Sequence, residues 1–222
     1  MADTVRLAYR ESGDPEAPPL VLLHGLTSDG TAWDEVAAHF GDRHRVLVPD
    51  LRGHGRSPHP GTYSFELMRD DVAALVDELG LEKATFIGHS LGGVVACLLA
   101  ARRPGLIERL VLEETPPPVP LNRPIPQRPS GPLPYDWAAR EAIVRQLNAP
   151  DPARRDAPAY VTAPTMVVAG GPESRLPQDE IAAMAARFPA GRLVTIPAGH
   201  LVHTTRPGEF CAAVEEFLEA LP

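Results

Sequence analysis

Short apolar runs alternate along the chain with segments in which apolar residues recur every three or four positions. The short runs contain no charged residue, which is typical of strands buried on both faces of a sheet. They lie at residues 20–23, 46–48, 84–87, 110–112, 165–168 and 193–196. The helical repeats lie at residues 65–79, 91–102, 178–188 and 208–221. Because parallel strands need crossover connections, this alternation predicts an α/β fold with a mostly parallel sheet and helices on both faces.

Two segments depart from this alternation. Residues 5–13 precede the first apolar run, and we expect them to add an antiparallel hairpin at one edge of the sheet. Residues 115–160 hold twelve of the 26 prolines, a density that prevents a long helix or a central strand. Within them, Asp136 is placed to cap a short helix over 137–147.

The proline-rich segment is followed by more strands and helices of the same kind. We therefore interpret residues 115–160 as a small cap inserted into one α/β core formed by residues 1–114 and 161–222. A linker between two domains is the alternative interpretation.

The composition narrows the class of protein. A chain of 222 residues can form one α/β domain without a metal or disulfide to stabilise it. The formal charge of −8 argues against nucleic acid or an anionic membrane as a partner.

Cys97 and Cys211 lie in apolar helical stretches, as buried thiols of a reducing compartment do. Residues 1–10 lack the apolar core of a signal peptide, and no run of about 18 apolar residues occurs. We expect a cytoplasmic protein that acts on a small molecule; its oligomeric state is left open.

The pentapeptide Gly88-His89-Ser90-Leu91-Gly92 fits the pattern G-x-S-x-G, between a predicted strand and a predicted helix. That context is what a nucleophile elbow requires, because the serine sits on a sharp turn and flanking glycines avoid collisions. The start of the helix also places free N–H groups beside the serine. The sequence therefore predicts Ser90 as a nucleophile.

A serine nucleophile needs a base, and His200 follows the last predicted strand. The carboxyl ends of parallel strands meet at one edge of the sheet, so Ser90 and His200 can meet there. His203 is the nearest rival for this role. The spacing of the two histidines could also suggest a metal site, but no third group of ligands supports one, and we expect neither metal nor cofactor.

An oxyanion hole needs two N–H donors near the carbonyl oxygen of the substrate. We expect one from Leu91, directly after the nucleophile, and the other from Leu26, in the loop after the first buried strand. His24 is expected to brace this loop rather than to take part in the chemistry.

Several segments together resemble the α/β-hydrolase superfamily. They are His24-Gly25, residues 50–57, the elbow at 88–93, and Gly199-His200 followed by Pro207 and Phe210. The resemblance spans roughly residues 20–220 outside the proline-rich segment. It implies an eight-stranded sheet with a cap, and a serine, a histidine and an acid as a catalytic triad. Members that open epoxides or remove halide use aspartate as the nucleophile, and this chain has serine at position 90.

The acid of the triad is where the sequence departs from the family pattern. The usual position falls in the loop at 170–174, where Glu173 stands in place of aspartate. A minority of the family takes the acid from the end of the preceding strand, where Glu113 and Glu114 lie. Alternation along that strand places Glu114 on one face and Glu113 on the other. We favour Glu114 and keep Glu173 as the alternative.

These residues predict acyl transfer to water through an acyl-enzyme, from an ester or lactone with a small to medium hydrophobic acyl part. Thioester, C–C bond and proline iminopeptidase-like hydrolysis are the enzymatic alternatives, and a receptor-like small-molecule-binding protein is the non-enzymatic one. The residues expected to line the substrate pocket are Trp33, His89, Leu133, Tyr135, Trp137 and Ile143.

Overall fold

The computed structural model describes residues 4–125 and 127–220. Its strands form one sheet in the order β1-β3-β2-β4-β5-β6-β7, in which β1 is antiparallel to β3 and the other neighbours are parallel. The strands are β1 (Tyr9–Ser12), β2 (Pro19–Leu23), β3 (Arg45–Pro49), β4 (Ala84–His89), β5 (Ile107–Glu113), β6 (Thr165–Ala169) and β7 (Gly191–Thr195). Five of the six predicted apolar runs lie within strands, the sixth extends past the end of β7 by one residue, Ile196, and the α/β fold is confirmed.

The sheet has seven strands in the described residues, whereas the family resemblance implied eight. The predicted hairpin at residues 5–13 is a single strand, β1. The amides before it bond to side chains instead of to a neighbouring strand: Val5 donates to Asp71, and Ala8 donates to the hydroxyl of Ser57. These contacts explain why pairing begins only at Tyr9.

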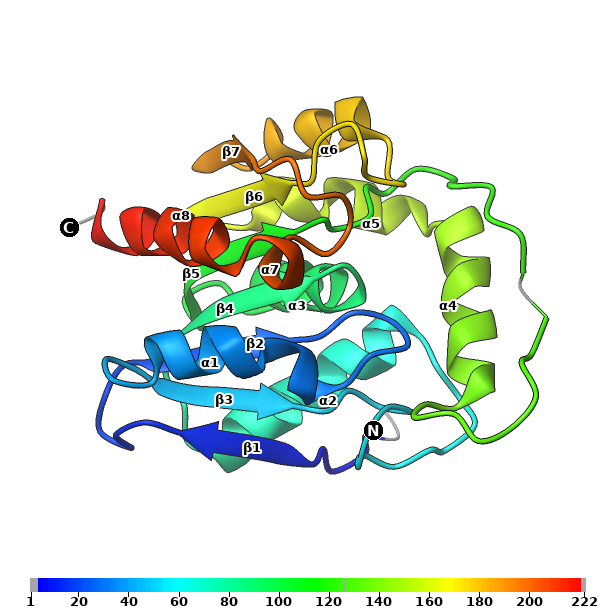
Figure 1. Ribbon diagram of the computed structural model, residues 1–222, viewed down its shortest axis with the longest axis horizontal. Coiled ribbons are helices and arrows are strands. Elements are labelled where there is room, and N and C mark those ends of the chain that lie inside the picture. Colours follow the sequence, from blue (N-terminus) through cyan, green and yellow to red (C-terminus); the bar gives the residue numbers. More distant parts are fainter. Residues whose placement is uncertain (1–3, 126, 221–222) are drawn as a thin grey trace.

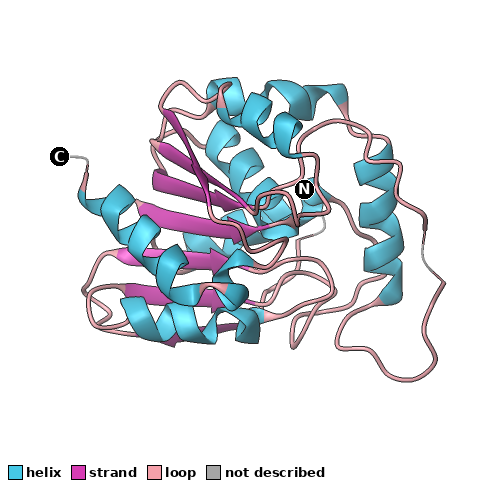
Figure 2. Cartoon of the chain, turned by 45° about the horizontal axis from the view of Figure 1, so that its top comes forward, coloured by secondary structure: helices cyan, strands magenta, loops and turns pink. Residues whose placement is uncertain are grey.

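Helices cover both faces of the sheet (Figures 1 and 2). Alternate residues of β2 point to opposite sides, since Val21 and Leu23 join one apolar cluster and Leu20 and Leu22 join the other. The first cluster packs against α2 (Phe65–Glu78), α3 (Leu91–Arg102) and α6 (Gln178–Ala185), and the second against α1 (Asp34–Phe40) and α8 (Pro207–Glu219). The predicted helix at 208–221 is α8, and residue 221 lies outside the described residues. No helix in the described ranges combines the length and apolarity that a membrane span needs.

The strand β7 is less buried than its apolar sequence predicted. It pairs with β6 alone and forms the edge of the sheet, so Leu193 is 42% exposed. The short helices complete the element order: η1 (Gly30–Trp33), α5 (Pro152–Asp156), η2 (Ala157–Tyr160) and α7 (Val202–Thr205).

The proline-rich segment runs beyond the carboxyl ends of the strands, where α4 (Trp137–Asn148) stands apart from the sheet (Figure 1). This helix is the one predicted at 137–147, and Asp136 caps it by accepting from the amide of Ala138 at 3.0 Å. The extended part of the segment is tied to the end of α4, because Leu121 donates to the carbonyl oxygen of Leu147 at 3.1 Å. Helix α4 thus lies at the edge of the sheet to which the predicted site belongs.

Candidate active site

Ser90 sits on the sharp turn between β4 and α3. Its backbone is in an unusual region for a non-glycine residue, with φ 50° and ψ −110°. The turn is tight enough to exclude side chains on both flanks. A Cβ at Gly92 would lie 2.2 Å from the carbonyl oxygen of Leu23, and one at Gly88 would lie 2.6 Å from the backbone of Gly92. The two glycines are therefore needed for the elbow to form.

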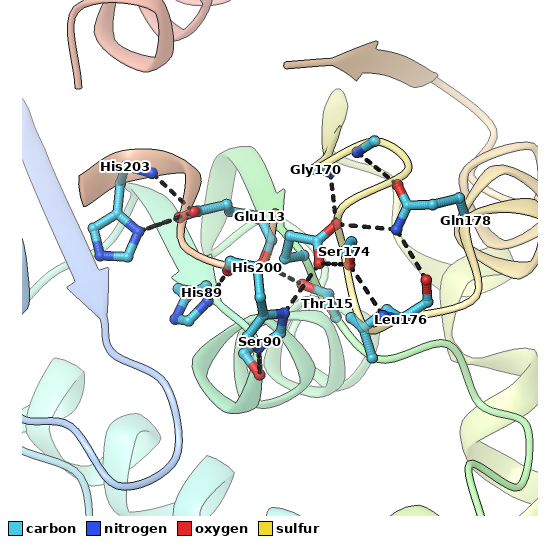
Figure 3. A network of polar contacts seen from close by, with 12 residues as sticks. His89, Ser90, Glu113, Thr115, Gly170, Ser174, Leu176, Gln178, His200 and His203 are labelled. Atoms are coloured by element: carbon cyan, nitrogen blue, oxygen red, sulfur yellow. Dashed lines mark hydrogen bonds and ion pairs between the residues drawn. The ribbon is translucent and has the colours of Figure 1, made fainter. Parts of the chain in front are cut away.

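His200 reaches Ser90 from the loop after β7. Its Nε2 lies 3.2 Å from the Oγ of Ser90, and its Nδ1 lies 3.0 Å from an oxygen of Glu114 (Figure 3). The structure thus brings together the predicted nucleophile, base and favoured acid. An imidazole placed between a hydroxyl and a carboxylate can accept the hydroxyl proton and be stabilised as the cation.

The carboxylate of Glu114 is buried and fully engaged by hydrogen bonds. One oxygen accepts from the amide of Gly170 at 2.6 Å and from the side chain of Gln178 at 3.2 Å. The other accepts from the hydroxyl of Ser174 as well as from His200. Burial raises the pKa of Glu114, but the bonds from His200, Ser174, Gly170 and Gln178 outweigh burial and leave that pKa below its ordinary value. The group is therefore an ionised carboxylate at neutral pH.

Gly170 links the carboxylate of Glu114 to the loop that carries His200. Its carbonyl oxygen accepts from the amides of Ala198 and Gly199 at 3.1 and 3.0 Å, while its own amide donates to Glu114. A Cβ at Gly170 would lie 1.9 Å from the carbonyl oxygen of Gly199, so only glycine fits. Glu173, the alternative acid, is exposed on the same turn, and the structure places Glu114 rather than Glu173 against His200.

A second glutamate–histidine pair lies beside the first. Glu113 accepts from the ring Nδ1 of His203 at 2.7 Å and from its backbone amide at 3.0 Å, and both side chains are buried. Burial raises the pKa of Glu113, but the attraction of His203 and the hydrogen bonds from its ring and its backbone amide outweigh burial and lower that pKa. This pair was not predicted, although strand alternation and the spacing of the two histidines could have indicated it.

The side chain of His89 contacts the backbone of His200. Burial lowers the pKa of His89 to about 4, with smaller effects from nearby charged groups, so its ring is neutral at pH 7. Its Nε2 therefore donates to the carbonyl oxygen of His200, at 2.8 Å. The backbone of His200 is thus held by a side chain from the elbow.

The two residues predicted to supply the oxyanion donors border the same cavity as Ser90. Leu26 and Leu91 both line it. The amide of Leu91 opens α3 and so has no acceptor within the helix. The loop that holds Leu26 is braced by His24, whose Nε2 accepts from the amide of Leu51 at 2.9 Å, as predicted.

The cavity above Ser90 has a volume of about 710 Å³. Its apolar wall is formed by Phe65 and by Ile143, Val144 and Leu147 of α4. Three arginines also line it: Arg123, Arg140 and Arg175.

Of the residues predicted to line the pocket, His89 and Ile143 do so. Trp33, Leu133, Tyr135 and Trp137 are absent from the lining that the described residues form, and this corrects the prediction. Trp33 is fully buried in the core, where its ring stacks on His203 at 4.1 Å. Tyr135 is buried against His54, and Trp137 lies under the guanidinium of Arg140.

Within residues 4–125 and 127–220, no group of three or more His, Cys, Asp or Glu side chains is arranged to hold a metal ion. Both cysteines, Cys97 and Cys211, are buried and free.

Comparison with known proteins places this geometry in a family. The family model described as alpha/beta hydrolase fold matches residues 18–132. The sn-1-specific diacylglycerol lipase ABHD11 of Mus musculus is 29% identical over 256 aligned positions, which cover 93% of this chain and 82% of the lipase.

Two solved structures extend the match to nearly the whole chain. A hydrolase from Pseudomonas aeruginosa superposes with a TM-score of 0.84 at 30% identity, covering 99% of this chain and 96% of its own. The enol-lactonase from Burkholderia xenovorans LB400 superposes with a TM-score of 0.81 at 25% identity, covering 96% of each chain. The chain therefore belongs to the α/β-hydrolase family, and it is a hydrolase.

Proposed function

We propose that this chain is a serine hydrolase that cleaves carboxylic esters or lactones through an acyl-enzyme, with Ser90 as nucleophile, His200 as base and Glu114 as the acid. The observation that carries the proposal is the continuous contact from the Oγ of Ser90 through the two nitrogens of His200 to the buried carboxylate of Glu114. A hydroxyl, an imidazole and a carboxylate in this order are the groups that acyl transfer requires.

In the first half-reaction, Nε2 of His200 takes the proton of Ser90 while Oγ bonds to the carbonyl carbon of the substrate. The carbonyl π electrons move onto oxygen, and the amides of Leu26 and Leu91 stabilise the resulting oxyanion. When the carbonyl re-forms, the bond to the leaving alcohol oxygen breaks and protonated His200 gives that oxygen its proton. The product is an ester of Ser90, and the ionised Glu114 stabilises the imidazolium that exists between the two transfers.

In the second half-reaction, water takes the place of the alcohol. His200 removes a proton from water as its oxygen bonds to the acyl carbon, and the same oxyanion forms again. Its collapse breaks the bond to the Oγ of Ser90, which recovers the proton from His200. A carboxylic acid leaves, and the enzyme returns to its starting state.

The proposed substrate class rests on the pocket and on the relatives. A lipase and an enol-lactonase are among the similar proteins, and both are named for the cleavage of esters or lactones. The wall formed by Phe65, Ile143, Val144 and Leu147 suits a small to medium hydrophobic acyl part. We assign α4, and with it residues 115–160, the role of a cap that provides most of this wall.

Labelling with a fluorophosphonate probe, followed by mass mapping, tests the nucleophile. We expect the label on Ser90, together with hydrolysis of 4-nitrophenyl butyrate that Ser90→Ala abolishes. A label on another residue, or turnover that survives Ser90→Ala, would overturn the proposal. A panel of matched esters, lactones, thioesters and proline amides assigns the bond type, and ester or lactone should give the highest kcat/KM.

A further inference from the structure

The proposed substrate pocket contains a cluster of positive charge that ester hydrolysis itself does not need. Its members come from three separate segments: Arg123 precedes α4, Arg140 lies on α4, and Arg175 lies in the turn before α6. Among the residues that the structure describes, no aspartate or glutamate lines this pocket. The excess of cations is local, because the chain as a whole has a formal charge of −8.

None of these three arginines forms an ion pair with a described carboxylate, although arginines elsewhere in the fold do. Arg187 pairs with Asp156 at 2.9 Å, for example. Arg140 instead contacts uncharged partners, the hydroxyl of Tyr135 at 3.3 Å and the ring of Trp137 at 5.2 Å. The charges of the cluster are thus not neutralised by the part of the protein that the structure describes.

Arg123 is the most constrained of the three. Its backbone is held by Asn148 at the end of α4, which accepts from the amide of Arg123 and donates to its carbonyl oxygen, both at 2.7 Å. Its Nη2 is buried and meets no hydrogen-bond partner within the described residues. Burial lowers the pKa of Arg123, and the positive charge of Arg175 adds to that effect.

A half-buried guanidinium without a counter-ion is unfavourable, since desolvation is not offset by a bonded anion. Carboxylates and phosphates match the fork of donors on arginine and would supply the missing partners. The positive charges of Arg123 and Arg175 repel each other, and an anion that contacts both would offset this repulsion. A bound anion would therefore neutralise charge that the described residues of the pocket leave without a counter-ion.

We propose that the substrate carries, besides its scissile ester or lactone, a carboxylate or phosphate group that Arg123 and Arg175 bind with the help of Arg140. This inference rests on the proposed serine hydrolase function, because it assigns the second end of the same substrate. The reacting carbonyl lies at Ser90, the apolar middle contacts Ile143 and Leu147, and the anion lies at the arginines. The acidic product would then hold a second negative charge if the anion belongs to the acyl part.

The test compares mono-4-nitrophenyl adipate with its methyl-capped, uncharged ester. We expect the wild-type protein to prefer the anionic substrate by about tenfold or more in kcat/KM, the range of one or two charge-assisted hydrogen bonds. Arg123→Gln and Arg175→Gln should each reduce this ratio severalfold, and Arg123→Lys should retain part of it. Added salt should also reduce the ratio, because Arg175 is exposed and salt screens its charge. The ratio within each variant cancels any general loss of activity.

Arg145→Gln is the matched control, because Arg145 is exposed on α4 and does not line the pocket. It should leave the ratio unchanged. 4-Acetoxybenzoate and its methyl ester place the anion on the alcohol side and identify which half of the substrate carries it. Competition by adipate or by inorganic phosphate identifies the anionic group, and whichever inhibits should do so less in Arg123→Gln.

A wild-type ratio near one on both substrate pairs, or competition by neither anion, would overturn the inference while leaving the serine hydrolase intact. If the wild type hydrolysed no ester and the probe did not label Ser90, the proposed function would fall instead. In that case calorimetry still decides whether an anion site exists. Ser90→Ala should bind adipate or phosphate, and the double variant Ser90→Ala with Arg123→Gln should lose this binding.

Discussion

Glu113 and Glu114 are consecutive in the chain, yet each binds a different histidine. Glu114 contacts the Nδ1 of His200 at 3.0 Å, and Glu113 contacts the Nδ1 of His203 at 2.7 Å. Only the first of these histidines reaches Ser90. We therefore expect one carboxylate to act on the reaction and the other to hold the loop that carries the base.

The proposed role of Glu114 predicts a large and specific loss of rate. Glu114→Gln should reduce kcat by about 10³-fold or more, because an amide neither orients the imidazole correctly nor stabilises its cation. Glu173→Gln should stay within about twofold of the wild type, since Glu173 is exposed and does not contact His200. Steady-state kinetics on 4-nitrophenyl butyrate measures both. The reverse ranking would transfer the acid role to Glu173.

Substitution of the two histidines should separate chemistry from stability. His200→Ala should abolish the burst of acylation. His203→Ala should leave a burst but lower the free energy of unfolding by about 3–5 kcal/mol, because it leaves Glu113 buried and uncompensated. Urea denaturation measures the second effect. His39→Ala breaks an exposed histidine–glutamate pair and should cost far less. If His203→Ala and His39→Ala lowered the free energy of unfolding equally, this would argue against a structural role for the pair of Glu113 and His203.

The buried histidines predict a stability that falls on mild acidification. Burial lowers the pKa of His89 to about 4 and that of His54 to about 3, whereas the unfolded chain titrates near 6.5. Below that value the unfolded state binds protons that the folded state does not, so stability is full above pH 6.5 and declines toward pH 4. Each such histidine contributes at most about 1.4 kcal/mol per pH unit.

The measurement is urea denaturation between pH 7 and pH 4. His89→Gln keeps an N–H donor for the carbonyl oxygen of His200 but does not titrate, so it should flatten the dependence. A wild-type stability that rose on acidification would contradict the assignment of neutral buried rings.

Two glycine substitutions should act in opposite directions. Gly92→Ala forces a Cβ to within 2.2 Å of a carbonyl oxygen in β2 and should destabilise the fold by about 1–3 kcal/mol or more, with loss of activity. Gly208→Ala lies in α8 with open space around its Cβ and should stabilise by about 0.5–1 kcal/mol. Thermal unfolding followed by circular dichroism measures both.

The parts of the molecule that follow from local pattern were predictable. Buried strands, the elbow at Ser90 and the capped helix after Asp136 each depend on a few neighbouring residues, and each occurs where the sequence indicated it. The exposure of β7 was not predictable, because an apolar run does not reveal whether its strand has one neighbour or two.

The lining of the pocket depended on tertiary packing and was predicted poorly. Trp33 has the size and polarity of a pocket residue, but its ring is stacked on His203 in the core. Conversely, Arg123 and Arg175 are 52 positions apart and carry no shared motif, so only the folded chain places both at one cavity. The choice between Glu114 and Glu173 was equally non-local, since it turns on which carboxylate the loop of His200 meets.

The main chain of the single residue Gly170 fixes how far apart the proposed acid and the proposed base can be. Its amide holds the carboxylate and its carbonyl oxygen holds the loop of His200, so the spacing of the two groups is set by main-chain atoms. We expect that side chains of the proposed cap can therefore change without altering the distance between Glu114 and His200. The proposed substrate specificity and the proposed chemistry thereby depend on different parts of one short chain.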